Sequence, residues 1–415
     1  MGDDFISSYI DYCSPGEAPN IFHRWAIISS LGAWLGRNYY FKHGHFVLKP
    51  NVYCMLMGVS GTRKSTPIKI VRKFMDKVGY KSFAAERTSK EQFLLDLSGV
   101  ESLVTVGDDE DTWNLDLEED AKAAADMMIA ADEFNDFIGQ GNMEFISLLG
   151  TLWDFEGPYK ARYKRAASTI INDPVVSILS GNTPTGFARA FPVESIGQGF
   201  FSRLLLIHAV PTDERIPFPT SPPDIETNRL ISRMHEIKAT CIGQAVPTDS
   251  ASALLSKIYK EYRPIDDVRF ESYCSRRFPH LLKLCLVAAA SLGTREITQD
   301  AVMYANTMLH AAEHFMPAAL GEFGKSKNSD VVQKIMQIIV SSNDIVKYEV
   351  LYKQLHAEVD SQEQLAGLVK NLIQAGRVQT VQGGLLPIKR AVASQAKYVD
   401  FSLLTLAERK SMGLV

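Results

Sequence analysis

The sequence predicts a mixed α/β fold, in which a central sheet is flanked by helices. Four apolar runs of strand length indicate the sheet: 52–57, 127–131, 175–180 and 204–207. Helical spacing of apolar residues dominates the chain from about 226 to 320. After 330 the pattern indicates three helices and then two short strands around Gly383-Gly384. We therefore expect a sheet-containing core, a helical region and a separate C-terminal domain.

Length and composition bound the class of protein. At about 150 residues per domain, 415 residues suggest two or three domains. The net charge of −4 excludes a generally basic surface, so any contact with DNA must be local. The five cysteines lack metal-site spacing and are typical of reduced thiols in the cytosol. The acidic N-terminus has no signal core and no run reaches the roughly 18 apolar residues of a membrane span, so we expect a cytoplasmic protein (in the host cytoplasm if phage-encoded) with no membrane partner.

A strand, a small-residue loop and a helix follow one another between Pro50 and Val78. The loop that begins at Gly58 has the sequence GVSGTRKS, and a helical pattern covers Ile68–Val78. This is the context of a P-loop, in which amides at a helix start converge on a phosphate. Lys64 is expected to reach the β- and γ-phosphates of ATP, and Ser65 to hold Mg²⁺. The residues predicted to bind nucleotide here are Gly58, Ser60, Gly61, Thr62, Arg63, Lys64, Ser65 and Thr66.

This loop departs from the G-x-x-x-x-G-K-[ST] template at one position, because Arg63 stands where the second glycine is expected. We expect Gly61 to supply the flexibility two residues earlier, and Arg63 to add a positive charge beside the phosphates. The alternative is an ordinary strand-to-helix turn that contains lysine and serine.

Two carboxylates, Asp132 and Glu133, end the apolar run Met127–Ala131. In P-loop enzymes the first such carboxylate orders Mg²⁺, and the second polarises the attacking water. Asp132 is therefore the expected metal residue and Glu133 the expected catalytic base. The alternative is a strand end with solvated acids. Glu86, at the end of a further strand expected over Tyr80–Ala85, is a second candidate for the base.

A basic cluster stands out in this acidic chain. Between Tyr159 and Arg165 the sequence YKARYKR holds four cations and two tyrosines. A basic hairpin tip suits a nucleic-acid backbone, and tyrosines offer stacking surfaces. The predicted DNA-binding residues are Lys160, Arg162, Lys164 and Arg165. A solvated charged loop is the alternative.

Polar residues flank the two remaining apolar runs. Asn182 follows the run Val175–Ser180, and its amide either orients water against the γ-phosphate or makes a turn before Thr-Pro. Arg203 precedes the run Leu204–Ile207, as a surface anchor or as a finger that reaches a neighbour's nucleotide. Such fingers raise the rate by roughly 10³ or more. Asn182 and Arg203 thus join Glu133 as catalytic candidates.

The helical region adds two candidates for nucleotide binding. Arg276 and Arg277 lead into the apolar helix Phe278–Leu292, where they either face the phosphates or lie on the surface. A second helix is expected over Ile297–Phe315, with Thr298 as its cap.

Changes in composition mark four parts of the chain. Residues 1–49 are expected to be helical, with a hairpin over Tyr39–Leu48, and to pack on the core. Residues 50–210 form the P-loop core, and a linker with five prolines between 211 and 224 begins a helical lid over 211–320. The small polar stretch 321–329 separates this lid from a winged-helix domain at 330–415, with helices over 330–341, 347–356 and 361–375. Winged helices bind DNA but also contact proteins, and both remain open.

Three stretches resemble a phage and bacterial family of P-loop proteins of unknown function that is often tied to primase–helicases. They are PNVYCMLMGVSGTRKST, NDPVVSILSGNTP and GFFSRLLLI, within residues 20–315. The family commonly has arginine before the P-loop lysine, as Arg63 is here. The Phe-Ser-Arg strand also resembles the arginine-finger segment of the minichromosome-maintenance helicases, which are AAA+ proteins. That resemblance implies that Arg203 acts in trans, that Asn182 is a sensor and that the basic hairpin is a pore loop.

The combined interpretation is a RecA/AAA+-like P-loop ATPase with a helical lid and a winged helix. We expect a ring-forming, ATP-driven DNA helicase or translocase of phage-type replication, with ATP and Mg²⁺ as cofactors. Its expected partners are DNA, single-stranded and in a central channel, further copies in a hexamer, and a primase or other replication proteins. The alternatives are a helicase loader or recombination mediator, a recombinase-like filament that uses Glu86, and a transcription regulator.

Overall fold

The computed structural model describes most of the chain, which forms two compact units. The described residues are 4–99, 125–139, 141–161, 169–191, 199–321, 323 and 398–414, and, in the C-terminal unit, 331–332, 334–336, 338–339, 342, 345–359, 361–374, 378–381 and 384–387. The larger unit comprises Met1–Gly321 together with Tyr398–Val415, and the smaller unit comprises Glu322–Lys397.

A sheet of four parallel strands forms the centre of the larger unit. These strands are β3 (Tyr53–Met57), β4 (Asp126–Ala131), β7 (Val175–Asn182) and β8 (Leu204–His208), in the spatial order β4-β7-β3-β8. Met57 pairs with Asn182 on one side and with His208 on the other, so the carboxyl ends of three strands are level. Nearly all of their residues are buried, as expected for a parallel sheet covered on both faces.

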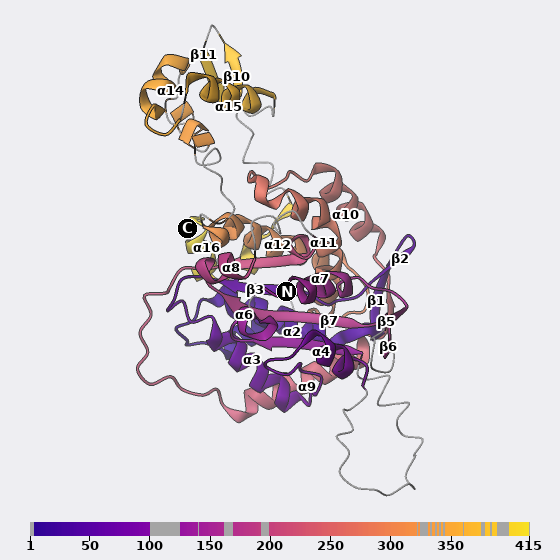
Figure 1. Ribbon diagram of the computed structural model, residues 1–415. Coiled ribbons are helices and arrows are strands. Elements are labelled where there is room, and N and C mark those ends of the chain that lie inside the picture. The colour runs from indigo at the N-terminus through magenta and orange to yellow at the C-terminus, as the bar shows by residue number, and fades with distance from the viewer. Residues whose placement is uncertain are drawn as a thin grey trace, which may run out of the picture. The chain divides into compact units, whose positions relative to one another are not determined.

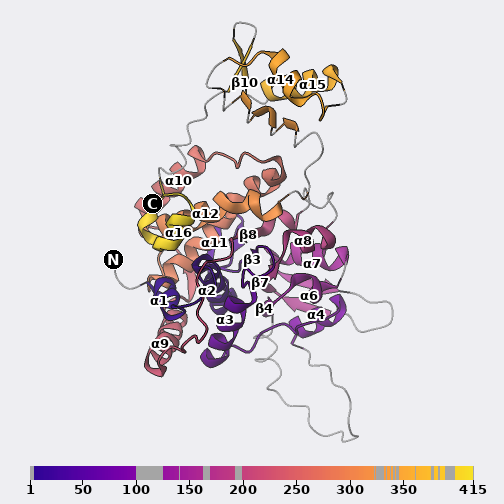
Figure 2. The same cartoon turned by 90° about the vertical axis from the view of Figure 1, so that its left-hand side faces the viewer.

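Helices cover both faces of this sheet (Figure 2). On one side lie α1 (Phe5–Tyr12), α2 (Asn20–Leu35), α3 (Ser65–Val78) and α9 (Asp224–Thr240), and on the other α4 (Lys90–Leu97), α6 (Phe134–Ile138), α7 (Met143–Leu152) and α8 (Pro184–Ala190). Helix α2 is buried on all sides, since every residue from Ile21 to Leu35 is buried, including the polar His23 and Arg24. It therefore acts as a core element rather than as a surface helix.

Further helices of the larger unit follow α9 in the chain: α10 (Asp249–Glu261), α11 (Glu271–Ser291), α12 (Gln299–Leu320) and α16 (Leu406–Ser411). Short 3₁₀ turns are η1 (Gly36–Asn38), η3 (Phe201–Arg203), η4 (Val268–Phe270) and η6 (Phe401–Leu403). Helix α12 begins at the expected cap, because the Thr298 hydroxyl accepts a hydrogen bond from the amide of Ala301 at 3.2 Å. Of the helices that the structure describes, none is both long and apolar enough to cross a bilayer.

Two small sheets lie beside the main one (Figure 1). In the first, β1 (Tyr39–His43) pairs antiparallel with β2 (Phe46–Leu48) and parallel with β9 (Gly243–Ala245). In the second, β5 (Pro158–Ala161) and β6 (Thr169–Asn172) form a hairpin. The amide of Val47 donates to Glu156 at 2.8 Å, which joins the two sheets.

The smaller unit has its own apolar core. Its elements are helical residues within 331–339, α14 (Tyr348–Leu355), α15 (Gln362–Gln374) and the antiparallel strands β10 (Val378–Val381) and β11 (Gly384–Pro387). Ile335, Ile339, Leu351 and Leu365 are fully buried in one cluster. This order of helices and hairpin is the one that the sequence predicts.

The mixed α/β fold is thus confirmed, together with the four expected strands, but one strand prediction is wrong. Residues Tyr80–Ala85 form no strand, because only Phe83 pairs with the sheet, as an isolated bridge to Met128. The parallel strand β9 was not predicted. Its three residues are too short to give a periodic signal.

The extent of the C-terminal domain also needs correction. The sequence places 330–415 in one domain, whereas Tyr398–Val415 belongs to the larger unit. The reason is a buried ion pair: Nε and Nη2 of Arg24 each lie 2.7 Å from an oxygen of Glu408. Arg24 also donates to the Tyr304 hydroxyl at 3.2 Å. Residues 322–397 are therefore an insertion within the larger unit.

Candidate functional site

The loop between β3 and α3 begins in a tightly enclosed turn. A Cβ atom added at Gly58 would lie 2.8 Å from the Thr62 hydroxyl oxygen and 2.9 Å from the Ala209 carbonyl oxygen, so only glycine fits. Gly61 has a φ of 87° and Arg63 a φ of 60°. The position where the template expects glycine therefore has a left-handed backbone although arginine occupies it, at a cost of about 1–2 kcal/mol. Gly61 therefore does not replace the missing glycine at position 63. Both Gly61 and Arg63 have a positive φ and turn the chain.

The loop leaves a row of backbone donors at the start of α3. Among the described residues, no protein acceptor pairs with the amides of Ser60, Gly61, Arg63 or Lys64. Unpaired amides at a helix start favour an anion, and the helix dipole adds to the positive potential there. These two pairs of amides, on either side of the paired amide of Thr62, are therefore available to a ligand with acceptor atoms.

Lys64 lies across its own loop. Its Nζ donates to the carbonyl oxygens of Gly58 at 2.8 Å and of Val59 at 3.0 Å. Partial burial lowers the pKa of Lys64, and the negative charge of Glu133 opposes that shift. An anion in the loop would offer this ammonium a charged acceptor in place of two neutral carbonyls, which strengthens the hydrogen bonds.

The ends of β4 and β7 bring the acid pair to this loop. A Cβ added at Gly181 would lie 2.6 Å from the Asp132 carbonyl oxygen and 3.4 Å from the Lys64 Cβ. Asp132 and Lys64 therefore both pack against the backbone of Gly181. The Ser180 hydroxyl donates to the Ala131 carbonyl at 2.7 Å and holds the two strand ends together. Lys64 and Asp132, which are distant in sequence, therefore meet at one edge of the sheet.

The side chains of the acid pair differ in their surroundings. Asp132 accepts from Lys69 Nζ at 2.8 Å, and Lys69 lies on the first turns of α3. Glu133 is exposed at the start of α6. Glu86, the competing candidate for the base, is 82% exposed and pairs with Arg72 at 3.3 Å. Of the two glutamates, Glu133 is the one whose charge acts on Lys64.

Asn182 lies at the end of β7 and is buried. Its amide nitrogen donates to Asn135 at 3.0 Å, and its amide oxygen accepts from the Thr183 amide at 2.9 Å. Asn135 in turn donates to the Gly186 carbonyl at 2.8 Å. Asn182 is therefore at the expected edge of the sheet, in a fixed orientation set by a neighbour that the sequence did not reveal.

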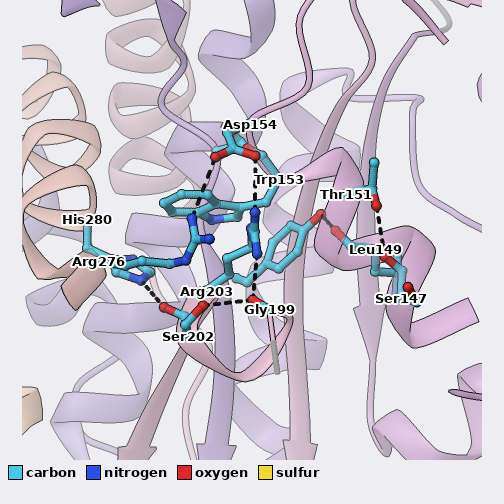
Figure 3. Close-up of polar contacts among 12 residues, drawn as sticks. Ser147, Leu149, Thr151, Trp153, Asp154, Gly199, Ser202, Arg203, Arg276 and His280 are labelled. Atoms are coloured by element: carbon cyan, nitrogen blue, oxygen red, sulfur yellow. Dashed lines mark hydrogen bonds and ion pairs between the residues drawn. The ribbon is translucent and has the colours of Figure 1, made fainter. Parts of the chain in front are cut away.

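Arg203 and Arg276 lie elsewhere. Arg203 immediately precedes β8, whose first residue pairs with Tyr53 at the amino end of β3. Both arginines approach Asp154 there, as Figure 3 shows. Because β8 is five residues or about 17 Å long, neither arginine is beside the loop of its own chain.

Arg277 is an internal structural residue. It is buried, and its Nε and Nη2 donate to Glu313 at 2.6 and 3.1 Å and to Asn306 at 3.0 Å. Tyr273 also donates to Glu313, at 2.9 Å. These contacts do not fit the expectation that Arg277 faces phosphates, because its donors are committed between α11 and α12.

The predicted DNA-binding cluster is described only in part. Lys160 is exposed on β5, whereas Arg162, Lys164 and Arg165 lie outside the described residues. The part of the chain that the structure describes contains no group of three His, Cys, Asp or Glu side chains arranged as a metal site.

Two residues of this site, Glu17 and Lys69, carried no signal in the sequence. Arg63 forms an ion pair with Glu17, whose carboxylate also accepts from the Ile216 amide. Lys69 forms an ion pair with the carboxylate of Asp132. Both partners depend on contacts formed by folding, and the segment around Glu17 has no motif that points to the loop.

Neither the comparison with protein-family models nor that with curated proteins gave a match.

Proposed function

We propose that the chain is a P-loop ATPase of the RecA/AAA+ type that assembles into a ring and moves along DNA as a helicase or translocase of phage-type replication. The observation that carries the proposal is the convergence of three strand ends: the loop with Lys64 after β3, Asp132 and Glu133 after β4, and Asn182 at the end of β7. Ligands of open α/β sheets bind outside the carboxyl ends of the strands, where these residues lie.

The residues present fit a magnesium–nucleotide complex. The exposed amides after Val59 and the ammonium of Lys64 would bind the phosphates. Mg²⁺ in such sites takes one or two protein oxygens and fills its shell with water and phosphate, so Ser65 and Asp132 are a sufficient donor set. The metal would neutralise charge that develops on the phosphates. Glu133 is exposed, its charge acts on Lys64, and it would accept a proton from the attacking water. Asn182 is fixed at the end of the neighbouring strand β7.

A second copy of the chain is needed for Arg203 to take part. Arg203 is a strand length away from the loop of its own chain, as described above, so it reaches a nucleotide only across an interface. Head-to-tail contacts of this kind close into rings when the rotation between copies allows it. A hexamer that surrounds single-stranded DNA follows from the resemblance to helicases rather than from the fold.

We assign DNA contact to the basic segment that begins on β5 and to residues 322–397. Lys160 is exposed on β5, and Arg162, Lys164 and Arg165 follow it in the sequence. The helices and the β10–β11 hairpin of the smaller unit have the order of a winged helix, which we propose it to be. This module binds DNA in many proteins and contacts other proteins, such as a primase, in others.

The proposal is tested by Lys64→Ala, with Lys73→Ala as the matched control because Lys73 is exposed on the same helix. Fluorescent ATP analogues measure binding, and phosphate release measures hydrolysis with and without single-stranded DNA. We expect hydrolysis that DNA stimulates in the wild type and in Lys73→Ala, and its loss in Lys64→Ala. Unchanged turnover in Lys64→Ala would overturn the proposal.

Two further readouts separate the motor from its alternatives. A helicase separates a labelled duplex, whereas a loader or mediator assembles on DNA with ATP but leaves strands paired. Light scattering with an ATP analogue and single-stranded DNA reports the assembly, and a monomer under all conditions would exclude a role for Arg203 in trans.

A further inference from the structure

A second charged cluster lies at the amino edge of the sheet (Figure 3). Arg203 ends the turn η3, and Arg276 projects from α11. Arg203 Nη2 lies 3.5 Å from one carboxylate oxygen of Asp154, and Arg276 Nη1 lies 3.9 Å from the other. One carboxylate thus faces two guanidinium groups that come from different parts of the chain.

Arg203 is held by its surroundings on several sides. Its Nη1 donates to the Gly199 carbonyl at 2.7 Å, and its guanidinium carbon lies 5.8 Å from the centre of the Trp153 ring. Its Nε is buried without a hydrogen-bond partner among the described residues. Only 13% of the side chain is exposed, so the guanidinium has little freedom to swing away.

Helix α11 supports this arrangement through one face. Arg276, His280 and Lys283 are spaced four and three residues apart and therefore lie on the same side of the helix. Burial lowers the pKa of His280 to about 3, so the ring is neutral and its Nε2 donates to the Ser202 carbonyl at 3.0 Å. Lys283 Nζ lies 4.4 Å from the Trp153 ring centre and donates to the Trp153 carbonyl at 3.1 Å. Side chains of α11 therefore hold the backbone of the residue before Arg203 and of the residue before Asp154.

The charges of this cluster do not balance. Two guanidinium groups and one carboxylate leave one net positive charge, and Lys283 lies behind them. The distances from Arg203 and Arg276 to Asp154 are longer than the 2.6–2.7 Å distances in the buried ion pairs Arg277–Glu313 and Arg24–Glu408. Each guanidinium has five N–H donors in a fork that suits a phosphate, and Asp154 takes up few of them. Arg276 is 36% exposed, so the site is open to a ligand.

We propose that Asp154 is a positioning residue that holds Arg203 and Arg276 side by side, so that both bind the terminal phosphate of a nucleotide in an adjacent copy of the chain. This inference rests on the proposed function. It moves Arg276 from the nucleotide of its own chain to that of a neighbour. Asp154 separates the like charges while the site is open, and the phosphate takes its place between them.

The first test is Asp154→Asn, which keeps the size of the side chain and removes its charge. We expect kcat for DNA-stimulated ATP hydrolysis to fall at least tenfold, with the dissociation constant for an ATP analogue within twofold of wild type. Asp154→Glu restores most of kcat, which a purely structural loss would not predict. Glu144→Gln, an exposed carboxylate on α7, is the matched control and keeps full activity. A normal kcat in Asp154→Asn overturns the proposal.

The second test mixes subunits. Asp154→Asn and Lys64→Ala subunits are each expected to be inactive alone and to regain hydrolysis together, because a Lys64→Ala subunit lends intact arginines to the Asp154→Asn nucleotide site. Arg276→Ala leaves Asp154 in place and is expected to behave like Asp154→Asn. If Arg203→Ala is restored by mixing but Arg276→Ala is fully active alone, the paired-arginine inference fails while the ATPase proposal stands. If Lys64→Ala hydrolyses ATP, the proposed function itself fails.

Discussion

At the carboxyl edge of the central sheet, the cations that form ion pairs are largely exposed, whereas at the amino edge buried side chains of α11 support the arginine pair. Lys69, which pairs with Asp132, is 65% exposed, and Arg63, which pairs with Glu17, is 49% exposed. Lys283 and His280 are buried. Exposed ion pairs contribute about 0–1 kcal/mol, so a ligand displaces them easily, while breaking buried charge contacts costs several kcal/mol. The carboxyl edge is thus suited to exchange ion-pair partners for a ligand, while at the amino edge buried side chains of α11 hold the backbone next to Arg203 and Asp154 in place.

The largest expected effect concerns the base at the carboxyl edge. Glu133→Gln removes the proton acceptor but little volume, and we expect kcat for ATP hydrolysis to fall by about 10²–10⁴ with nucleotide binding retained. Glu86→Gln is the comparison, because Glu86 is exposed and paired with Arg72, and it is expected to stay within twofold of wild type. The reverse pattern, with Glu86 essential, would favour the filament ATPase and remove the role given to this edge.

A smaller effect tests how rigid the amino edge is. Burial lowers the pKa of Lys283 to about 7. The negative charge of Asp154 opposes this decrease, and the positive charges of Lys49 and Arg203 add to it. The unfolded lysine has a pKa near 10.4, so between pH 7 and 9 the unfolded state binds more protons and stability rises with pH. Below pH 7 both states are protonated and this gain is lost.

The measurement is urea unfolding, followed by tryptophan fluorescence, of the wild type and Lys283→Met. The advantage of the wild type over the variant is expected to grow by about 2 kcal/mol from pH 7 to pH 9. Lys257→Met, at an exposed position on α10, should show no such trend. A constant difference between wild type and Lys283→Met across this range would mean that Lys283 is not held in a dehydrated site.

The smallest effect probes the exchange of partners at the carboxyl edge. Glu17→Gln releases Arg63 from its carboxylate, and we expect ATP to bind a few-fold more tightly because Arg63 is free to meet phosphate. Fluorescence titration with an ATP analogue measures the change, with Asp76→Asn at the far end of α3 as control. In an Arg63→Ala background the gain should disappear. If it persists there, Glu17 acts through its charge alone and not through Arg63.

Local patterns in the sequence identified strands and candidate residues but not partners. The runs that became β3, β4, β7 and β8 were recognisable because buried strands are continuously apolar, and the polar residues after them marked the edge of the sheet. Tyr80–Ala85 contains Lys81 and Ser82 among its apolar residues and gains only one bridge, at Phe83. A strand depends on a ladder of hydrogen bonds, which composition does not report.

The arginines show the same limit more clearly. Arg276 and Arg277 are adjacent in the chain, yet one approaches Asp154 at the amino edge and the other is buried against Glu313, 36 residues away. On a helix, neighbouring residues point about 100° apart, so their environments differ. From their charge, the sequence predicts the same role for both arginines. Only the packing of α11 against α12 distinguishes them.

The Arg24–Glu408 pair has a consequence for how the protein is made. Its two residues are 384 positions apart, so at 5–20 residues per second the carboxylate leaves the ribosome roughly 20–80 s after the arginine. Until then the α2 guanidinium lacks its ion-pair partner, and enclosing it would cost several kcal/mol. Helix α2 is therefore expected to stay loosely packed on the nascent chain, and the larger unit to reach its final form only after residues 322–397 have been synthesised.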